Sequence, residues 1–358
     1  MKGLSVKEVL RNNYIMPAEW SSHSATMLIW PHNRETWPGS RLASVERVYS
    51  NIIQTLLKYE PVLLIADNQK IKSRAIQILG ETNSQKYPLK IVVTPVNDVW
   101  ARDSGPIIVR DREQFLITDW EFNSWGGKYA PWEDDNKLPE KISDLFSLPI
   151  RKTNIVLEGG SIETNGEGLF LTTESVLLNS NRNPALTKEQ IESHLERYLG
   201  AKKIIWLKEG LVGDDTDGHI DDLTRFVNKN TVVTAVSDDP DNPNYEILKE
   251  NLRILEQSKD LNGESLHIIH LPLPDTYADE PTVDGSEHVP SSYANFYIAN
   301  GTVLLPMYDE KSDQQILDLF SVLFPDRAIE GIACGDLVWG QGSIHCITQQ
   351  LYGLNIPE

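Results

Sequence analysis

The chain has 358 residues, of which 40% are hydrophobic and 24% charged, and its glycine and proline content is ordinary for a globular protein. This composition excludes a wholly disordered, collagen-like or low-complexity protein, and it leaves one large domain or two smaller ones open. The sequence contains 52 acidic and 33 basic residues, so the formal charge is −19. Such a charge disfavours nucleic acid and anionic membranes as partners and attracts small cations.

Cellular location and redox state follow from what the sequence lacks. No window approaches the ~18 consecutive apolar residues of a membrane span, and the first residues lack the apolar core of an export signal. We therefore expect a cytoplasmic protein with no membrane partner. Its two cysteines, Cys334 and Cys346, are expected to be free thiols in a reducing compartment.

The first half of the chain combines apolar strands with one amphipathic helix. Residues 25–31 are typical of a strand, and apolar side chains at helical spacing predict a helix over 45–56 with Ser44 as its N-cap. Two pairs of apolar strands separated by polar turns then predict hairpins at 107–118 and 161–177, the second through an Asn-Gly turn.

The second half repeats this alternation of helices and strand pairs. A capping box at Thr187–Gln190 predicts a helix that ends at Gly200, and Asn242-Pro243 predicts the start of another. The remaining strands are predicted as hairpins at 224–236 and 295–307 and a single strand at 343–349.

Four hairpins and two single strands near opposite ends of the chain indicate five similar modules. If strands 25–31 and 343–349 pair with each other, they complete a fifth hairpin and close a ring. We therefore predict an α/β fold of five modules arranged in a ring. An ordinary α/β sheet with several antiparallel hairpins is the alternative, and the spacing of the hairpins does not decide between the two.

Side chains capable of catalysis stand just before the predicted hairpins. In a ring of modules, equivalent positions converge on one central cavity, so three carboxylates, an imidazole and a thiol would meet there. Each residue alone is more typical of a turn or of a buried structural position, and only their combination indicates a site. The residues are Asp103, Glu158, His219, Asp221 and Cys346.

This combination indicates the kind of substrate. The cysteines lack the spacing of a zinc site, the acidic run at 214–217 lacks the pattern of a calcium loop, and no phosphate-binding glycine motif occurs. We therefore expect no metal and no cofactor. A guanidinium fits the set, because its N–H groups pair with carboxylates and a thiolate can attack its central carbon.

The motifs around these residues identify a family resemblance. They are Trp-x-Arg-Asp-x-Gly-Pro at 100–106, Leu-Glu-Gly-Gly at 157–160, Gly-His-Ile-Asp at 218–221 and Ile-His-Cys-Ile-Thr-Gln-Gln at 344–350. In this order they resemble the agmatine deiminases of the Porphyromonas-type peptidyl-arginine deiminase family. The resemblance covers nearly the whole chain and implies a single catalytic domain over 1–358. It also implies the pentein fold, a five-bladed α/β propeller of ββαβ modules with pseudo-fivefold symmetry.

The resemblance implies a role for each residue at the matching positions. Cys346 would be the nucleophile that forms an amidino-cysteine, and His219 would protonate the departing ammonia and then activate water. Asp103 and Asp221 would hold the guanidinium nitrogens, and Glu158 would orient His219. Asp215 would bind the far ammonium of agmatine, and the Trp100 ring would pack against the guanidinium. The product would be N-carbamoylputrescine, a precursor of putrescine.

Several departures from the family pattern concern specificity. The chain has Gln341 and Ser343 where the family has glycine and asparagine, and it has Asp217 and Asp222 at positions where asparagine is common. A deiminase of free or peptidyl arginine with the same mechanism is therefore the first alternative. A Cys-His amide hydrolase and a non-catalytic polyamine-binding protein are the others. A homo-oligomer is allowed but not required by the sequence.

Overall fold

The computed structural model describes residues 14–82, 85–112, 114–274, 282, 285–286 and 288–356. Within these ranges the strands form five separate sheets, each of three or four strands. Residues 1–13, to which the expectation of no export signal refers, lie outside the described residues. None of the described helices combines the length and the apolar composition needed to cross a bilayer.

The five sheets share one topology. In each, an antiparallel strand pair is extended by a parallel strand that follows later in the chain. The first sheet has the order β17 (Gln349–Leu351), β2 (Ala25–Ile29), β3 (Val62–Ala66), β4 (Leu89–Val93). The second has the order β1 (Tyr14–Ile15), β5 (Ile107–Asp111), β6 (Gln114–Glu121), β7 (Ile150–Val156). The third has the order β10 (Lys203–Leu207), β9 (Leu169–Thr173), β8 (Glu163–Thr164). The fourth is β11 (Thr224–Phe226), β12 (Thr231–Val236), β13 (His267–Pro272), and the fifth is β14 (Tyr297–Ile298), β15 (Thr302–Met307), β16 (Ala328–Ala333).

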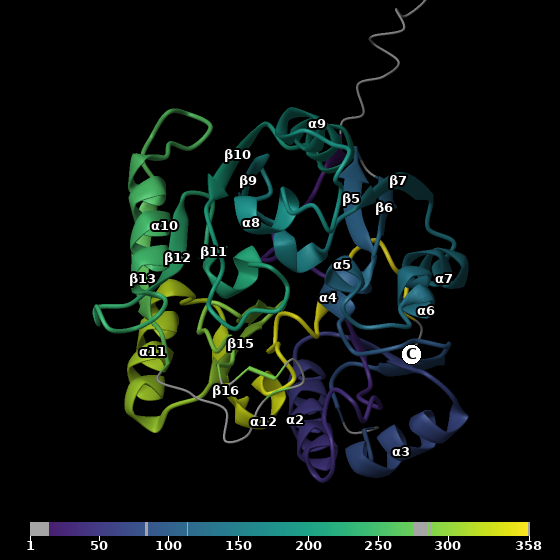
Figure 1. Ribbon diagram of the computed structural model, residues 1–358. Helices are drawn as coiled ribbons and strands as arrows, with labels where there is room; N and C mark the ends of the chain where they lie inside the picture. Colours follow the sequence, from purple (N-terminus) through teal and green to yellow (C-terminus); the bar gives the residue numbers. More distant parts are fainter. Residues whose placement is uncertain are drawn as a thin grey trace, which may run out of the picture.

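Helices connect the parallel strands of each sheet. The longer ones lie on the outside of the molecule, with the strands toward its middle (Figure 1). They are α2 (Arg41–Leu56), α3 (Gln69–Leu79), α7 (Leu138–Phe146), α9 (Lys188–Leu199), α10 (Tyr245–Gln257) and α11 (Glu310–Leu323). The short ones are α4 (Ala101–Ser104), α5 (Ser124–Gly127), α6 (Glu133–Asn136), α8 (Glu174–Leu177) and α12 (Gly335–Val338), with single 3₁₀ turns η1 (Gly159–Ser161) and η2 (Ile220–Asp222).

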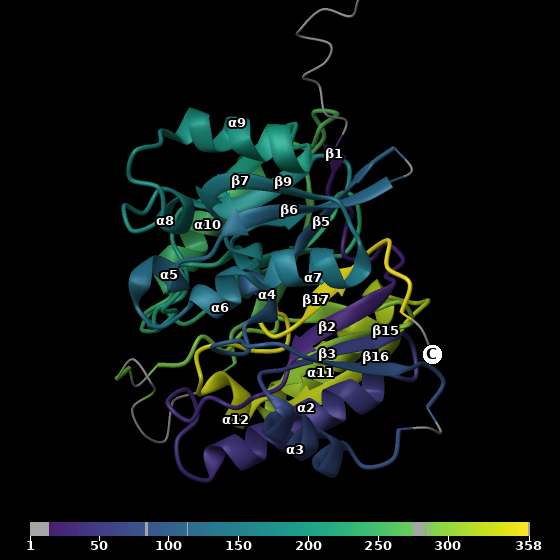
Figure 2. The ribbon, with the colours of Figure 1, turned by 90° about the vertical axis from the view of Figure 1, so that its right-hand side faces the viewer.

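The predicted hairpins are confirmed as antiparallel pairs, including the one split between the two ends of the chain. β17 pairs with β2 through Gln349 opposite Met27, and the two strands lie side by side in Figure 2. The predicted strand at 343–349 was wrong in extent, because residues 343–348 form turns. The amides of Ile347 and Thr348 donate to the carbonyls of Ser343 and His345, so the backbone folds back before β17 begins.

Two of the three predicted helix starts were wrong, one by four residues and the other by two. α2 begins at Arg41 after Ser40, where Arg41 lies 4.7 Å over the Trp339 ring. α10 begins at Tyr245, because the Asn242 carbonyl accepts from the Tyr245 amide and closes a separate turn. The helix predicted from the Thr187 capping box is confirmed, and it ends at Gly200 in the left-handed conformation.

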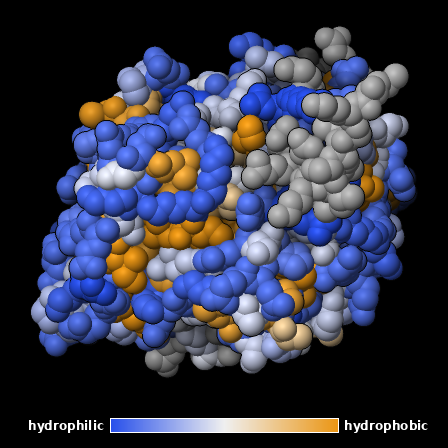
Figure 3. All heavy atoms as spheres, turned by 90° about the horizontal axis from the view of Figure 1, so that it is seen from above, coloured by the Kyte–Doolittle hydropathy of each residue, from blue (hydrophilic) through white to orange (hydrophobic). Residues whose placement is uncertain are grey.

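The apolar core is divided among the sheets. One cluster of buried side chains packs α2 against the first sheet and extends to Trp100 and Cys346, so this part of the core supports the proposed site directly. The face over α9 is mostly hydrophilic, with separate hydrophobic groups between the polar ones (Figure 3).

Candidate active site

Four chain segments that precede different hairpins supply the predicted residues. Asp103 lies in α4 before β5, and Glu158 is the residue before η1. His219 directly precedes η2, which contains Asp221. α4 contacts η1 and η1 contacts η2, while the Arg102 amide donates to the Cys346 carbonyl at 3.1 Å. The structure therefore brings the segments together, as the sequence pattern predicted.

Gly160 explains why the second motif needs glycine at this position. A Cβ atom built on Gly160 would lie 2.6 Å from His219 Nδ1, 2.8 Å from Asp103 Oδ1 and 3.0 Å from Asp221 Oδ2. The imidazole and both predicted guanidinium-binding carboxylates thus surround one point, and any side chain there would occupy the space between them.

Asp103 is held by two donors and is almost fully buried. Its Oδ1 accepts the Gly160 amide at 2.9 Å, and its Oδ2 accepts the Trp125 indole N–H at 3.0 Å. Burial and, next, the Glu158 carboxylate raise the pKa of Asp103 to about 7. A cation placed against this carboxyl group would reverse both effects and favour its ionised form.

Asp221 is completely buried and belongs to a chain of hydrogen bonds. Its Oδ2 lies 2.7 Å from His345 Nδ1, and His345 Nε2 lies 2.8 Å from Glu19 Oε2. Burial and the nearby Asp103 raise the pKa of Asp221 well above its ordinary value. His345 and Glu19 were not among the predicted site residues.

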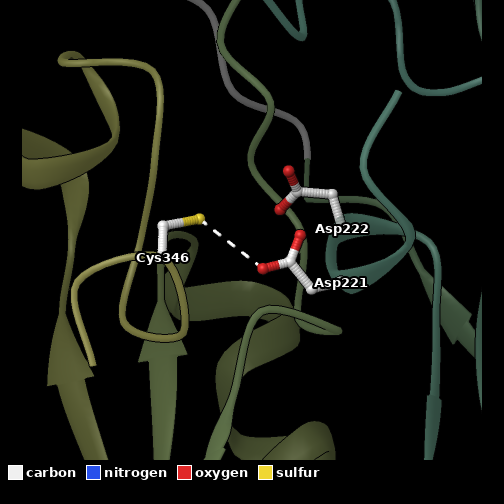
Figure 4. Close-up of side chains that lie close together, drawn as sticks. All are labelled: Asp221, Asp222 and Cys346. Carbon is white, nitrogen blue, oxygen red and sulfur yellow. Dashed lines mark hydrogen bonds between the residues drawn. The ribbon is translucent and has the colours of Figure 1, made fainter. Parts of the chain in front are cut away.

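Cys346 faces the carboxylates across the site, as Figure 4 shows for Asp221 and Asp222. Its Sγ lies 3.9 Å from Asp221 Oδ2 and accepts the Asn295 side-chain N–H at 3.2 Å. Burial and the surrounding carboxylates raise the pKa of the thiol well above its usual range. In the absence of a cation, therefore, Cys346 is a protonated thiol.

Glu158 is paired with a residue that the sequence analysis did not single out. Its Oε1 accepts from Arg182 Nε at 2.5 Å, and the same guanidinium contacts Asp217 at 2.6 Å. Burial and the Arg182 charge lower the pKa of His219 well below its ordinary value, so the imidazole is neutral. The predicted orientation of His219 by Glu158 stays a prediction.

Three polar atoms of the site lack partners among the described residues, although all are buried. They are Glu158 Oε2, His219 Nε2 and Asp221 Oδ1. A buried acceptor without a donor costs about 1–3 kcal/mol, so such atoms are normally satisfied by a ligand or by water. Two carboxylate oxygens and one ring nitrogen at one site suit a ligand rich in N–H donors.

A pocket of about 380 Å³ opens onto Asp103 and Cys346. Its aromatic walls are Trp100, as predicted, together with Trp125 and Tyr129. Its other acidic residues are Glu35, Asp98 and Asp215, and none of the described residues that line it is a lysine or arginine. The Tyr129 hydroxyl donates to Asp215 at 2.6 Å. The pocket can therefore take an extended molecule that is cationic at both ends.

Some of the missed residues had a signal in the sequence. Asn295 lies just before β14, a position similar to those of Asp103, Glu158 and His219 before their strand pairs, and its amide contacts both Cys346 and Asp222. Trp125 had no such signal, because it reaches Asp103 from a turn with left-handed φ angles.

The residues closest to a metal-binding arrangement are Asp221, Asp222 and Cys346, whose potential ligand atoms lie within 4.8 Å of one another. The three include no imidazole and only one thiol, so they do not match a zinc site. We assign no metal to them.

Comparisons with known proteins agree with this geometry. A model of the Porphyromonas-type peptidyl-arginine deiminase family matches residues 15–351. Relatives from Mycoplasma capricolum and Latilactobacillus sakei are 35% and 36% identical, each over 95% of this chain and 96% of the relative. Both are provisionally named agmatine deiminases.

Solved structures show the same relationship. The agmatine deiminase of Enterococcus faecalis has a TM-score of 0.88 at 30% identity and 98% coverage of both chains. A Cys-to-Ser agmatine deiminase of C. jejuni with substrate bound has a TM-score of 0.85 at 31% identity, with 95% of this chain and 97% of that chain covered. An amidinotransferase of Microseira wollei, at 10% identity and a TM-score of 0.53 over 95% and 97% of the two chains, shares the fold alone.

The fold is thus the α/β fold of agmatine deiminases and amidinotransferases, the pentein-like class of enzymes. Within that class, the chain belongs to the Porphyromonas-type peptidyl-arginine deiminase family. The family predicted from the four motifs is confirmed.

Proposed function

We propose that the protein hydrolyses agmatine to N-carbamoylputrescine and ammonia, a step in putrescine biosynthesis. The observation that carries the proposal is the meeting of Cys346, His219, Asp103 and Asp221 beside an acidic pocket that Asp103 and Cys346 line, with buried polar atoms on Glu158, His219 and Asp221 that are unpartnered among the described residues. Relatives named as agmatine deiminases support the choice of substrate.

The reaction proceeds through a covalent intermediate. The bound guanidinium lowers the pKa values of Cys346 and of the carboxyl groups, because a cation stabilises the charged form of each. As the cation binds, the Cys346 thiol proton passes to the neutral His219 imidazole and leaves a thiolate. The thiolate attacks the guanidine carbon, the His219 imidazolium gives that proton to the departing ammonia, and an amidino-cysteine remains. His219 then removes a proton from water, which attacks the same carbon and releases the ureido product and the thiol.

Asp103 and Asp221 hold the guanidinium nitrogens and Trp100 packs against its plane. The cation–π contact is worth roughly 0.5–2 kcal/mol. The far ammonium lies toward Asp215, on the acidic side of the pocket. Glu158 is assigned the orientation of His219, with its Oε1 held by Arg182 and its Oε2 without a hydrogen-bond partner among the described residues.

The pocket also favours agmatine over arginine. Arginine carries an α-carboxylate, which requires a basic partner when it is buried. The described lining residues supply only acidic charges, from Glu35, Asp98, Asp103 and Asp215. An arginine or arginyl-peptide deiminase would place its negative group among them.

The test compares ammonia and ureido product from agmatine, free arginine and an arginyl peptide. We expect agmatine to have the highest kcat/KM, and equal or better turnover of arginine contradicts the proposal. Cys346→Ser is expected to reduce turnover by about 10³-fold or more while agmatine still binds. Substantial turnover by this variant contradicts nucleophilic catalysis by Cys346.

We further propose that the five sheets form a closed five-bladed propeller in one domain. The shared topology of the sheets and the pairing of β2 with β17 support it. A cytoplasmic location, a reaction without metal or cofactor, and the absence of nucleic-acid partners belong to the same proposal, and a homo-oligomer is compatible with it. Activity that survives a metal chelator is the expected result.

A further inference from the structure

Behind the guanidine-binding carboxylates lies a buried chain of three ionisable groups. Asp221 Oδ2, His345 and Glu19 Oε2 are joined by contacts of 2.7 and 2.8 Å. Their side chains are at most 5% exposed. Asp221 has a second oxygen, Oδ1, without a hydrogen-bond partner among the described residues, and its Oδ2 faces the point shared with His219 and Asp103.

Counting protons shows what this arrangement can do. Each of the two contacts joins a ring nitrogen to a carboxylate oxygen, and each therefore needs one proton. The proton between His345 Nε2 and Glu19 belongs to the imidazole, because Arg225 and Arg102 keep Glu19 ionised at 2.9 and 3.3 Å. The proton between Asp221 and Nδ1 has two positions. It gives either a neutral acid beside a neutral imidazole or a carboxylate beside an imidazolium.

We propose that His345 is a positioning residue that accepts the Asp221 proton when a guanidinium binds. The O–H bond of Asp221 breaks and the Nδ1–H bond of His345 forms, so Asp221 becomes a carboxylate without releasing a proton to solvent. This inference rests on the proposed guanidine-binding role of Asp221, and it adds His345 and Glu19 to the residues that prepare the site.

The surrounding charges favour the neutral arrangement in the empty site. Burial and Asp103 raise the pKa of Asp221, while burial and the Arg102 and Arg225 charges lower that of His345. A guanidinium bound between Asp221 and Asp103 favours the Asp221 carboxylate, and ionised Glu19 then stabilises the imidazolium. The other groups near this chain are Asp103, Asp214, Asp222 and Cys346 around Asp221, and Glu163, Tyr297, Tyr352 and Arg327 around Glu19.

The experiment measures proton release on binding. Cys346→Ala protein, which binds without turnover, is titrated with agmatine and separately with guanidinium chloride in calorimetry buffers of different ionisation enthalpy. The same titrations are made with Cys346→Ala/His345→Asn and Cys346→Ala/His345→Gln. Asn keeps a hydrogen bond toward Asp221 and Gln keeps one toward Glu19, but neither accepts a proton. Cys346→Ala/His194→Asn is the matched control, because His194 lies on α9 and contacts only the Gln190 carbonyl among the described hydrogen bonds.

We expect each His345 variant to release nearly one more proton per bound cation than the parent and the control. Its affinity should also fall about tenfold more for each pH unit of acidification. Asp103 releases its own proton in the parent, in the control and in each His345 variant, so it does not change the difference in proton release between them. Equal proton release in parent and variants overturns the role of His345. If guanidinium binds and agmatine does not, the substrate proposal fails while this test still stands. If neither binds, both proposals fail.

A second measurement needs no change at position 345. Histidine labelled with ¹⁵N in the Cys346→Ala protein reports the protonation of each ring, and His219→Asn identifies the signal of the other buried histidine of the site. We expect a histidine other than His219 to become imidazolium when the cation binds. A His345 ring that stays neutral with ligand bound overturns the proposal even if the His345 variants do not fold.

Discussion

Gly160 shows how one hydrogen atom in place of a methyl group keeps the site open. Its φ lies outside the left-handed region, so the backbone accepts alanine, but the added carbon would lie 2.6 Å from His219 Nδ1. We expect Gly160→Ala to lower kcat/KM by about 100-fold or more, because even small displacements of reacting groups are costly. Steady-state kinetics on agmatine measure the effect.

Gly335→Ala is the matched control, because nothing lies within 4 Å of the added carbon and its φ is also outside the left-handed region. Its kinetics should stay within about twofold of wild type. A Gly160→Ala enzyme with the same kinetics as this control would show that the space beside His219 is not used.

The raised pKa of Asp103 predicts an acid limb in the activity profile. Its pKa is about 7 in the empty site, and only the ionised form pairs with a guanidinium. We therefore expect kcat/KM, which reports on the free enzyme, to fall about tenfold per unit as pH drops below about 7. The kcat value should change less, because the bound cation lowers this pKa.

Asp119 offers a control for this assignment. Burial raises its pKa to about 6, but it lies in β6 and does not line the pocket. Asp119→Asn should leave the acid limb in place. A wild-type kcat/KM that is flat between about pH 5.5 and pH 8 would contradict the role given to Asp103.

The sequence predicted the proposed reacting groups, which the structure brings together, better than the groups that contact them. Asp103, His219 and Cys346 could be found because each stands in a short motif before a strand pair. Glu19 and His345 could not, because their function depends on a contact between residues 326 positions apart. His345 directly precedes Cys346, and nothing in the local pattern separates its role from that of a buried structural histidine.

At the level of single elements, α9 offers a direct test of local sequence signals. Thr187 Oγ1 accepts the Gln190 amide and Gln190 Oε1 accepts the Thr187 amide, which completes the capping box. We expect Thr187→Ala to reduce the free energy of unfolding by about 1 kcal/mol, because the Gln190 amide in the first turn loses its side-chain acceptor. Chemical denaturation followed by circular dichroism measures it.

Ser193 lies exposed in the middle of the same helix, so Ser193→Ala should change stability by less than about 0.5 kcal/mol. Equal effects of the two substitutions would show that the cap does not stabilise α9.

Element boundaries were predictable where side chains close the end of the element themselves. The Thr187 box and Gly200 define α9 within the local sequence. The start of α2 is set instead by a distant contact, because Arg41 packs on Trp339. β17 is shorter than its apolar pattern for a related reason. The turns at 343–348 direct Cys346 toward the pocket, and no periodic pattern signals them.

At the scale of the whole molecule, Glu19 ties distant segments together. Its carboxylate contacts Arg102, Arg225 and His345 and accepts the Ile298 amide at 2.8 Å. Glu19→Ala leaves two buried guanidinium groups without one of their partners, so we expect the free energy of unfolding to fall by about 3–5 kcal/mol. Urea unfolding at neutral pH gives the value.

Glu140→Ala is the control. It removes a surface ion pair with Lys152 and should lower the free energy of unfolding by less than about 1 kcal/mol. The Arg225 and Arg102 charges and the hydrogen bond from His345 hold the pKa of Glu19 well below 4.5 despite burial. The stabilisation that ionised Glu19 gives to the folded state is therefore complete above about pH 4.5, and it is lost as the pH falls through the lowered pKa of Glu19. A Glu19→Ala protein as stable as the Glu140→Ala protein would contradict this role.

The pairing of β17 with β2 also has a consequence during protein synthesis. β2 leaves the ribosome early, but its partner strand emerges only after all four other sheets have been translated. Cys346 comes just before that partner strand, so the sulfur reaches its place when the nascent chain makes one of its last backbone pairings. A chain that ends before this point contains the carboxylates and the imidazole but not Cys346, so under the proposed mechanism it lacks the nucleophile.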